Sequence, residues 1–519
     1  MNVHWKDKIT EKIPEAGKWV VLSLSLIVYA FLSVTSFLST AYFEMDYLET
    51  TYYKRDSLLL HLLAACCFLF FLYWVKKKEV LERVSSKKLC IILLCYTAVF
   101  AGIWSVASHA VPSADQAKLT ECAAGFIKGD FYNLSPGKYL QIWPQQLGFT
   151  AYLEVLFRVF GPFSYSAGEW VNVCFICLEF YLIYKITELL FADKKVTNMV
   201  LIFLFGFFPY MFFSTFLYGD IPGAPVALAS VYFFIRFMRE KRLSYGISAV
   251  LGLGLSVQFK QNNLIIAVAV ILYLLMKGLE QRKKVCLLMI ALSVLSVGIL
   301  DAGVKKYYET RSGYEIEGGV SPLMYIAMGM QESDMAEGWY NGYILGSFWE
   351  CDEDFERSAE KAVQDIKESV NNFISHPAYA LKFYYHKTVS QWTNPTFECL
   401  WISHFEKVHD GPLHPVVQSI YEGKLHRLFL LFANEYQWIL YACAFTGMLS
   451  LRKKCTLDQL LLALIVLGGF FFHILWEAKT RYVLFYAVLL IPYAALGCER
   501  IMSALKMGFG IKKKEAAAK

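Results

Sequence analysis

Residues 244–278 decide the fold of this chain, and they read SYGISAVLGLGLSVQFKQNNLIIAVAVILYLLMKG. Two apolar runs, 244–260 and 262–278, follow one another with only a short polar break between them. An α-helix of roughly 20 apolar residues crosses the hydrocarbon core of a bilayer, and an isolated strand there could not satisfy its backbone hydrogen bonds. The stretch therefore predicts two consecutive membrane-spanning helices joined by a tight turn.

The same pattern extends along the whole chain. Hydrophobic residues make up 57% of the sequence and charged residues only 18%, which is too apolar for a soluble protein with a polar surface. We predict an all-α polytopic membrane protein with about 12–13 transmembrane helices, an external helical loop after the third span and a small external soluble subdomain before the last three spans. The predicted spans are 19–43, 57–75, 89–107, 170–191, 196–217, 220–239, 244–260, 262–278, 285–303, 425–450, 457–476 and 481–500.

Short basic clusters beside these runs set the orientation. Lysines at 76–78 and 87–88 and the basic triplets at 452–454 and 512–514 favour a cytoplasmic location. The predicted location is therefore the cell membrane, multi-pass, with both termini cytoplasmic. This placement of basic residues is not that of a nucleic-acid-binding surface, so no nucleic acid is expected as a partner.

The predicted organisation has four parts. A transmembrane module covers 1–303 and carries an external loop at 108–143, which contains a short amphipathic helix at 114–128. An external soluble or interfacial subdomain follows at 304–424, with helical spacing at 352–373. C-terminal transmembrane helices occupy 425–502, and a basic cytoplasmic tail ends the chain at 503–519. Three cysteines fall in the external segments, and a disulfide between two of them stays open: Cys122, Cys351 and Cys399.

The segment 144–161 allows two interpretations. It contains Glu154 and Arg158, and a charge at the bilayer centre costs roughly 2.5–3.5 kcal/mol. It is either an interfacial or partly inserted helix, or a span whose charges face a cavity. The second interpretation requires the lysine pair 194–195 to be external, against the positive-inside tendency.

Asp115 is the candidate for catalysis. It follows a span directly and opens the helix at 114–128. A helix N-terminus stabilises a carboxylate, so Asp115 could be a simple capping residue. Alternatively, an ionised carboxylate at the boundary between water and lipid can accept a proton from the hydroxyl or amine of an acceptor.

Three further charged residues fall at predicted outer ends of spans. Asp220 is either a turn residue or a contact for sugar hydroxyls. Lys260 lies on the external side against the positive-inside tendency, where it either snorkels to head groups or stabilises a released phosphate. Arg481, which we expect to pair with Glu477, is either one half of an ion pair or a phosphate clamp. In the first loop, Lys138 and Tyr139 are weaker phosphate or sugar candidates.

In these motifs the sequence resembles the GT-C superfamily of glycosyltransferases that use polyprenyl-phosphate sugars. The resemblance is to the bacterial relatives of protein O-mannosyltransferases and of the lipid A aminoarabinose transferase. It rests on order and spacing over most of the chain, and the matching elements are Asp115, Gly129-Asp130-Phe131, Trp143-Pro144, Phe208-Pro209, Leu217-Tyr218-Gly219-Asp220, Phe259-Lys260-Gln261-Asn262 and Glu477-Ala478-Lys479-Thr480-Arg481-Tyr482. The last of these adds Tyr482 to the predicted substrate-binding residues.

The chain departs from the family pattern at two points. Gln116 follows Asp115 where many members have a second carboxylate, and one proline, Pro144, stands where two are usual. A mechanism with two carboxylates is therefore in doubt.

The resemblance implies a hexosyl- or pentosyltransferase that moves a sugar from a polyprenyl-phosphate donor to an extracytoplasmic glycan, lipid or protein, with inversion and with Asp115 as the base. It implies no required cofactor and leaves a divalent metal open. His404, His409 and His414 recur at regular intervals, but a helix-breaking segment interrupts them and no carboxylate completes a site, so no metal site is predicted. The alternatives are a transporter or flippase of lipid-linked sugars, or a ligase or polymerase of surface polysaccharide.

Overall fold

The structure is a computed structural model that describes residues 2–45, 49–404 and 413–517. Every apolar run predicted to span forms a helix. These helices are α1 (Asn2–Leu38), α2 (Leu58–Lys77), α4 (Ser86–Ser108), α8 (Tyr165–Phe191), α9 (Lys194–Gly206) with α10 (Phe208–Phe212), α11 (Asp220–Glu240), α12 (Leu243–Phe259), α13 (Leu264–Gln281), α14 (Val285–Ser312), α21 (Lys424–Leu451), α22 (Leu457–Leu475) and α23 (Leu484–Ala517).

Within the described part of the chain, nine helices are long and apolar enough to cross a membrane by themselves. The segment from α9 to Thr215 makes a tenth if its two halves, bent by 54°, count as one span. Two predicted spans are not among these ten. Helix α12 has only 17 residues, and α8 contains the buried carboxylates of Glu169 and Glu179.

Contacts between helix ends show which loops share a side. The Lys195 ammonium lies 3.2 Å from the carboxylate of Glu82, in the short helix α3 (Val80–Arg83) that links α2 to α4. The Asn198 amide donates to the backbone carbonyls of Leu81 and Val84. The lysine pair 194–195 therefore lies beside the basic loop at 76–88. The predicted orientation, in which both basic segments are on the cytoplasmic side, requires this.

A second set of ion pairs extends this side of the molecule. Arg239 and Lys277 both contact the Asp458 carboxylate, at 2.9 Å and 3.0 Å. Arg239 also donates to the carbonyl of Leu189, near the end of α8. The end of α8 therefore lies on the same side as these ion pairs. Nine or ten helices of the described chain are long and apolar enough to cross a membrane, and crossings by α8 and α12 stay predictions.

The segment 144–161 folds as a 3₁₀ turn followed by α7 (Leu147–Phe160). Its 14 residues would extend about 21 Å, against a hydrocarbon core of about 30 Å. The Glu154 carboxylate is paired with Arg158 at 2.6 Å and with Arg311 at 2.9 Å. This short, charged helix favours the interfacial or partly inserted interpretation over the span.

The orientation yields a testable prediction. A cysteine introduced at Ser113, beside α5 (Ala114–Lys128), should react with a membrane-impermeant thiol reagent added outside intact cells, because both interpretations of α7 place this loop outside. A cysteine at Ser85, in the loop beside Glu82, should react only after the membrane is permeabilised. The measurement is labelling relative to the parent protein. If the cysteine at Ser85 were labelled in intact cells and the cysteine at Ser113 were not, the orientation would be the opposite of the predicted one.

The first predicted span, 19–43, is wrong at its end. Helix α1 stops at Leu38, and residues Ser39–Phe43 form strand β1, which pairs antiparallel with β2 (Thr51–Arg55). Ser39 lies opposite Arg55 and Phe43 opposite Thr51. The β-branched and aromatic residues of this stretch favour a strand once the chain leaves the bilayer. The all-α prediction therefore needs one small hairpin added.

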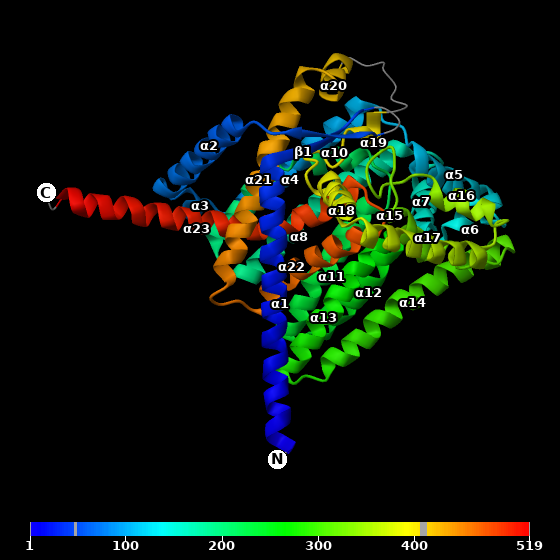
Figure 1. Cartoon of the computed structure of the whole chain (residues 1–519), viewed down its shortest axis with the longest axis horizontal. Helices are drawn as coiled ribbons and strands as arrows, with labels where there is room; N and C mark the ends of the chain where they lie inside the picture. The colour runs from blue at the N-terminus through cyan, green and yellow to red at the C-terminus, as the bar shows by residue number, and fades with distance from the viewer. Residues whose placement is uncertain (1, 46–48, 405–412, 518–519) are drawn as a thin grey trace.

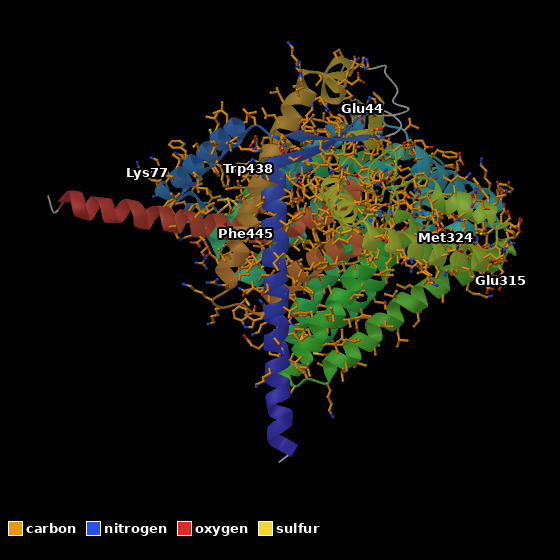
Figure 2. All side chains as sticks on the ribbon, in the orientation of Figure 1. Glu44, Lys77, Glu315, Met324, Trp438 and Phe445 are labelled. Atoms are coloured by element: carbon orange, nitrogen blue, oxygen red, sulfur yellow. The ribbon has the colours of Figure 1, made fainter. Side chains whose placement is uncertain are left out.

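The described helices of the predicted external segments are α5, α6 (Tyr139–Ile142), α15 (Pro322–Gly329), α16 (Tyr343–Glu350), α17 (Phe355–Ser375), α18 (Pro377–Trp392), α19 (Trp401–His404) and α20 (His414–Tyr421). Helices α5, α6, α16 and α17 lie at one end of the molecule, far from α2 and the C-terminus, whereas α20 lies at the top (Figure 1). In the same view Glu315 and Met324 lie toward the end with α16 and α17, and Lys77 lies far from it (Figure 2). Helix α17 agrees with the predicted helix at 352–373, whereas His409 lies outside the described residues.

The predicted subdomain at 304–424 is not separate along its whole length. Helix α14 continues through its first residues to Ser312. Between Lys387 and Ser403 almost every side chain is buried, because this stretch packs on α21, α22 and α23. The segment therefore contributes to the helical bundle as well as to the external surface.

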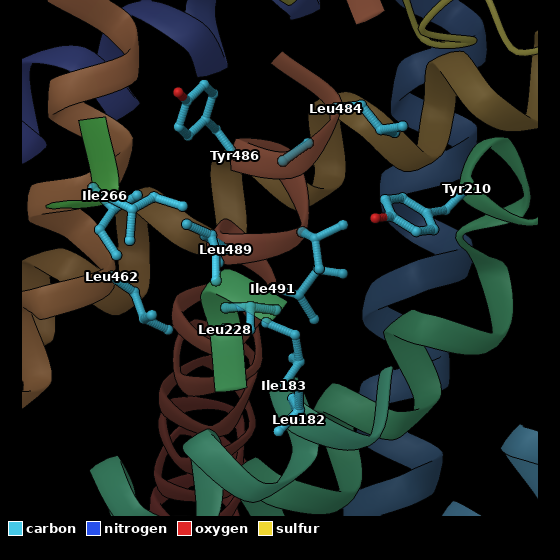
Figure 3. Packing of buried hydrophobic residues seen from close by; sticks show 14 of the residues in the cluster. Leu182, Ile183, Tyr210, Leu228, Ile266, Leu462, Leu484, Tyr486, Leu489 and Ile491 are labelled. Carbon is cyan, nitrogen blue, oxygen red and sulfur yellow. The ribbon is translucent and has the colours of Figure 1, made fainter. Parts of the chain in front are cut away.

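The centre of the bundle is apolar and closely packed. Side chains of α8, α10, α11, α13, α22 and α23 meet there, among them Ile183, Leu228 and Leu489 (Figure 3). Helices α21 and α23 touch through glycines: a Cβ at Gly447 would lie 1.9 Å from the Tyr493 carbonyl oxygen, and one at Gly497 would lie 2.0 Å from that of Cys443. All thirteen cysteines are free, so the structure contains no disulfide among Cys122, Cys351 and Cys399.

Candidate active site

Asp115 lies in the first turn of α5 with its side chain exposed. The Tyr139 hydroxyl donates to its Oδ1 at 3.0 Å, and the Tyr218 hydroxyl lies 3.5 Å from Oδ2. Burial and the neighbouring carboxylate raise the pKa of Tyr139, so this phenol keeps its proton. The hydrogen bonds of the carboxylate thus come from side chains rather than from its own helix, which favours an oriented, accessible base over a simple cap.

The second element of the site is a buried ionic cluster at the outer ends of α11, α12 and α23. The Lys260 ammonium lies 2.9 Å from Asp220 Oδ2, and Arg481 Nη1 lies 3.7 Å from the same oxygen. These three residues were predicted separately from the sequence, and the structure brings them together.

A close approach of two turns makes this arrangement possible. A Cβ at Gly219 would lie 1.8 Å from the carbonyl oxygen of Phe259, so only glycine fits before Asp220. The chain is extended at Lys260, between the end of α12 and a 3₁₀ turn at Gln261–Asn263. The two turns therefore present Asp220 and Lys260 to each other.

Tyr218 joins the carboxylate of Asp115 to this cluster. The Lys260 ammonium lies 4.4 Å from the centre of its ring and the Arg481 guanidinium 5.1 Å, distances typical of cation–π contacts. Its hydroxyl accepts from the Gln146 amide at 2.5 Å. The sequence placed Tyr218 inside a family-like motif but gave no reason to assign it a role.

Tyr482 covers the cluster on another side. Its ring centre lies 5.4 Å from the Lys260 ammonium and 5.0 Å from the Arg481 guanidinium. Asp220, Lys260, Arg481 and Tyr482 line one cavity together with Asn262. Tyr482 therefore adjoins the ionic cluster, whereas Tyr139 contacts Asp115. Substrate binding by either tyrosine stays a prediction.

Arg481 Nη1 has no hydrogen bond in this cavity to any residue that the structure describes, because its ion-pair partner, Asp220 Oδ2, lies 3.7 Å away. This nitrogen is buried. A buried guanidinium N–H without an acceptor is costly unless a ligand supplies one. The missing partner is an anion or another acceptor.

One prediction about this region needs correction, and one predicted residue, Lys138, lies apart from the cluster. Glu477 was expected to pair with Arg481, but the ion pair of Arg481 is with Asp220, and Glu477 accepts from the Tyr482 hydroxyl at 3.4 Å. Lys138 does not reach the cluster, because its ammonium lies over the ring of Tyr132 at 5.2 Å. The spacing of four between Glu477 and Arg481 pairs side chains on a helix, whereas the chain here is extended at Lys479.

A buried network of charged side chains, which the sequence did not predict, holds the backbone next to Arg481. The Lys479 ammonium lies 2.7 Å from a Glu49 carboxylate oxygen, at the β1–β2 connection, and 3.7 Å from Glu398. Glu398 also accepts from the backbone N–H of Thr480 at 3.0 Å. Three distant parts of the chain therefore fix the backbone next to Arg481.

This network gives a prediction for pH. Burial raises the pKa of Glu398 to about 7, from 4.5. A carboxyl group whose pKa is raised by folding contributes fully to stability at a pH below its pKa in the unfolded chain. That contribution is lost as the pH rises through its pKa in the folded protein, here about 7. Glu398→Gln removes the titration. The melting temperature of the wild type should therefore fall relative to that of the variant between about pH 5 and about pH 8, and parallel curves would contradict the assignment.

Within the described ranges, no group of three or more His, Cys, Asp or Glu side chains is placed to hold a metal ion. Independence from a cofactor stays a prediction.

A comparison with protein families matches a part of the chain that contains residues of this site. Residues 147–300 match the family model of dolichyl-phosphate-mannose-protein mannosyltransferases, which confirms the resemblance over α7 to α14. That range contains Tyr218, Asp220 and Lys260, whereas Asp115 and Arg481 lie outside it. A comparison with curated proteins gave no significant match.

Among solved structures, the chain is similar to ArnT from Cupriavidus metallidurans, whose crystal structure was determined with undecaprenyl phosphate bound. The identity is 12%, the match covers 78% of this chain and 77% of ArnT, and the TM-score is 0.35. A similarity of this size is too small to relate individual residues of the two proteins.

Proposed function

We propose that this protein is a membrane glycosyltransferase that moves a sugar from a polyprenyl-phosphate donor to an acceptor outside the cytoplasm. One observation carries the proposal: an exposed carboxylate, Asp115, and a buried cationic pair, Lys260 and Arg481, flank the same residue, Tyr218, at the outer ends of the spans. The family match over 147–300 supports the same class of reaction.

The chemistry follows from the charges. Asp115 takes the proton of the acceptor hydroxyl, and the acceptor oxygen forms a bond to the anomeric carbon of the sugar. The bond from that carbon to the phosphate oxygen breaks, and its electron pair leaves with the polyprenyl phosphate. Attack on the face opposite the leaving phosphate inverts the anomeric carbon.

Lys260 and Arg481 would stabilise the leaving phosphate. Both are largely buried, with exposed side-chain fractions of 15% and 12%, so their charges act in a medium that screens them weakly. Arg481 Nη1, which has an ion pair with Asp220 but no hydrogen bond within the described chain, supplies a donor for a phosphate oxygen. Asp220 is the counter-ion of both cations.

Transport of the lipid-linked sugar is the main rival. A flippase needs no base, so the oriented carboxylate of Asp115 would have no task in it. A polysaccharide ligase or polymerase would share the external site but not the monophosphate donor.

Donor identity can be tested directly. Purified protein in liposomes would be given labelled polyprenyl-phosphate hexose, polyprenyl-phosphate pentose or a nucleotide sugar, together with acceptors from lysed cells. We expect transfer from one of the two lipid donors and none from the nucleotide sugar. Equal transfer from the nucleotide sugar would contradict the proposal.

A further inference from the structure

A second cavity lies beside the ionic cluster, on the other side of the turn at Gln261–Asn263. It has a volume of about 250 Å³ and lies between α7, α12, α13 and α14. Pockets for drug-sized ligands usually measure about 300–1,000 Å³, and this cavity is slightly smaller. Its size therefore suits a compact group such as a single sugar ring.

The cavity adjoins the proposed reaction centre through two pairs of neighbouring residues. Gln145 lines the cavity, whereas Gln146 bonds to the Tyr218 hydroxyl beside Asp115. Gln261 lines the cavity, whereas Lys260 belongs to the ionic cluster. On each segment, therefore, the residue that lines the cavity is the direct sequence neighbour of a residue of the proposed reaction centre.

The polar side chains that line the cavity can form hydrogen bonds with the hydroxyl groups of a sugar. Within the described chain, neither Gln258 nor Gln261 uses its side-chain amide in a hydrogen bond, although Gln258 is only 9% exposed. An amide both donates and accepts, as a sugar hydroxyl does. Asp301 and Lys305, an ion pair at 3.1 Å on α14, complete the polar part of the wall.

The cavity is polar at its outer end and apolar deeper in the membrane. On α14, Val297 and Gly298 lie one turn deeper than Asp301. On the neighbouring segment, Leu264 lies one turn deeper than Gln261. A ligand that fits both parts has a hydroxylated head group and an apolar tail.

We propose that this cavity binds the acceptor, and that the acceptor is a hydroxyl-bearing head group carried by a lipid. The inference rests on the proposed transferase activity, which requires an acceptor hydroxyl close to Asp115 and on the far side of the sugar from the phosphate. The donor phosphate belongs to the ionic cluster across the turn, so the two substrates enter from different cavities.

Cysteine labelling tests this without turnover. Gly298 lines the cavity and Gly303 does not, and neither has an atom within 4 Å of the position of an added Cβ. Gly298→Cys and Gly303→Cys, each in liposomes, would be labelled with a small thiol reagent in the presence of octyl glucoside, octyl galactoside or octyl mannoside below their micellar concentrations. At ten times its dissociation constant, a bound glycoside should slow labelling at Gly298→Cys about tenfold.

Three outcomes decide the proposal. Slower labelling at Gly298→Cys alone, lost on adding Gln261→Leu, supports it. Equal slowing at both positions, or no slowing with any glycoside, overturns it. Protection by polyprenyl phosphate instead would assign the cavity to the donor and also overturn it. The labelling experiment measures binding and involves no sugar transfer. A negative labelling result would therefore not bear on the transferase proposal, and glycoside binding could still be measured if the protein were found not to be a transferase.

Discussion

Asp115→Asn should lower the rate of sugar transfer by about 10²–10⁴-fold, the usual contribution of a general base. The amide keeps the size of the side chain, and its oxygen can still accept the hydrogen bond from the Tyr139 hydroxyl. It cannot accept the proton of the acceptor. We therefore expect kcat to fall while the donor affinity and the melting temperature stay close to those of the wild type.

Asp130→Asn is the matched control for this variant. Asp130 lies just beyond the other end of α5, where its carboxylate accepts only a local bond from the Tyr132 backbone N–H. Its replacement should leave transfer within about twofold of the wild type, as surface substitutions usually do. Activity of Asp115→Asn close to that of Asp130→Asn would remove Asp115 as the base.

Lys260→Met should lower transfer by about 10²–10³-fold, because the loss of one preorganised group that stabilises a developing charge has this size of effect. The variant also leaves the Asp220 carboxylate without its 2.9 Å partner in a largely buried position, so part of the loss could reflect instability. The double variant Lys260→Met with Asp220→Asn separates the two effects. It should recover the melting temperature but not the activity.

Lys138→Met serves as the control for the loss of one positive charge on the same external face. Its ammonium contacts the Tyr132 ring instead of the ionic cluster, so transfer should be unchanged. Recovery of activity by the double variant would show that Lys260 has a structural role only, and equal losses in Lys138→Met would point to a general charge effect.

Much of the helical framework could be predicted because the membrane restricts the chain to few solutions. Backbone groups in lipid must be satisfied within one segment, so each long apolar run becomes a helix. The same constraint places Asp220, Lys260 and Arg481 at one level, since each lies at the outer end of a span. The external helix at 114–128 was also predictable, from its amphipathic spacing and the glycine that ends it.

The contacts that complete the site could not be predicted in the same way. Lys479 takes its partners from residues 49 and 398, and no local pattern relates three positions so far apart. The strand at 39–43 continues an apolar run, so hydropathy alone extended the first helix through it. Tyr218 acquires its role only because the fold places Asp115, Lys260 and Arg481 around one ring.

The central claim is that the sugar leaves the polyprenyl phosphate at this site. The most direct measurement follows a doubly labelled donor, with one label on the sugar and one on the phosphate, in liposomes that contain the purified protein and extracted acceptor lipids. The account predicts that the sugar label appears on the acceptor while an equal amount of polyprenyl phosphate is released. If both labels instead crossed the bilayer together on one lipid molecule, the protein would be a flippase and the account would be contradicted.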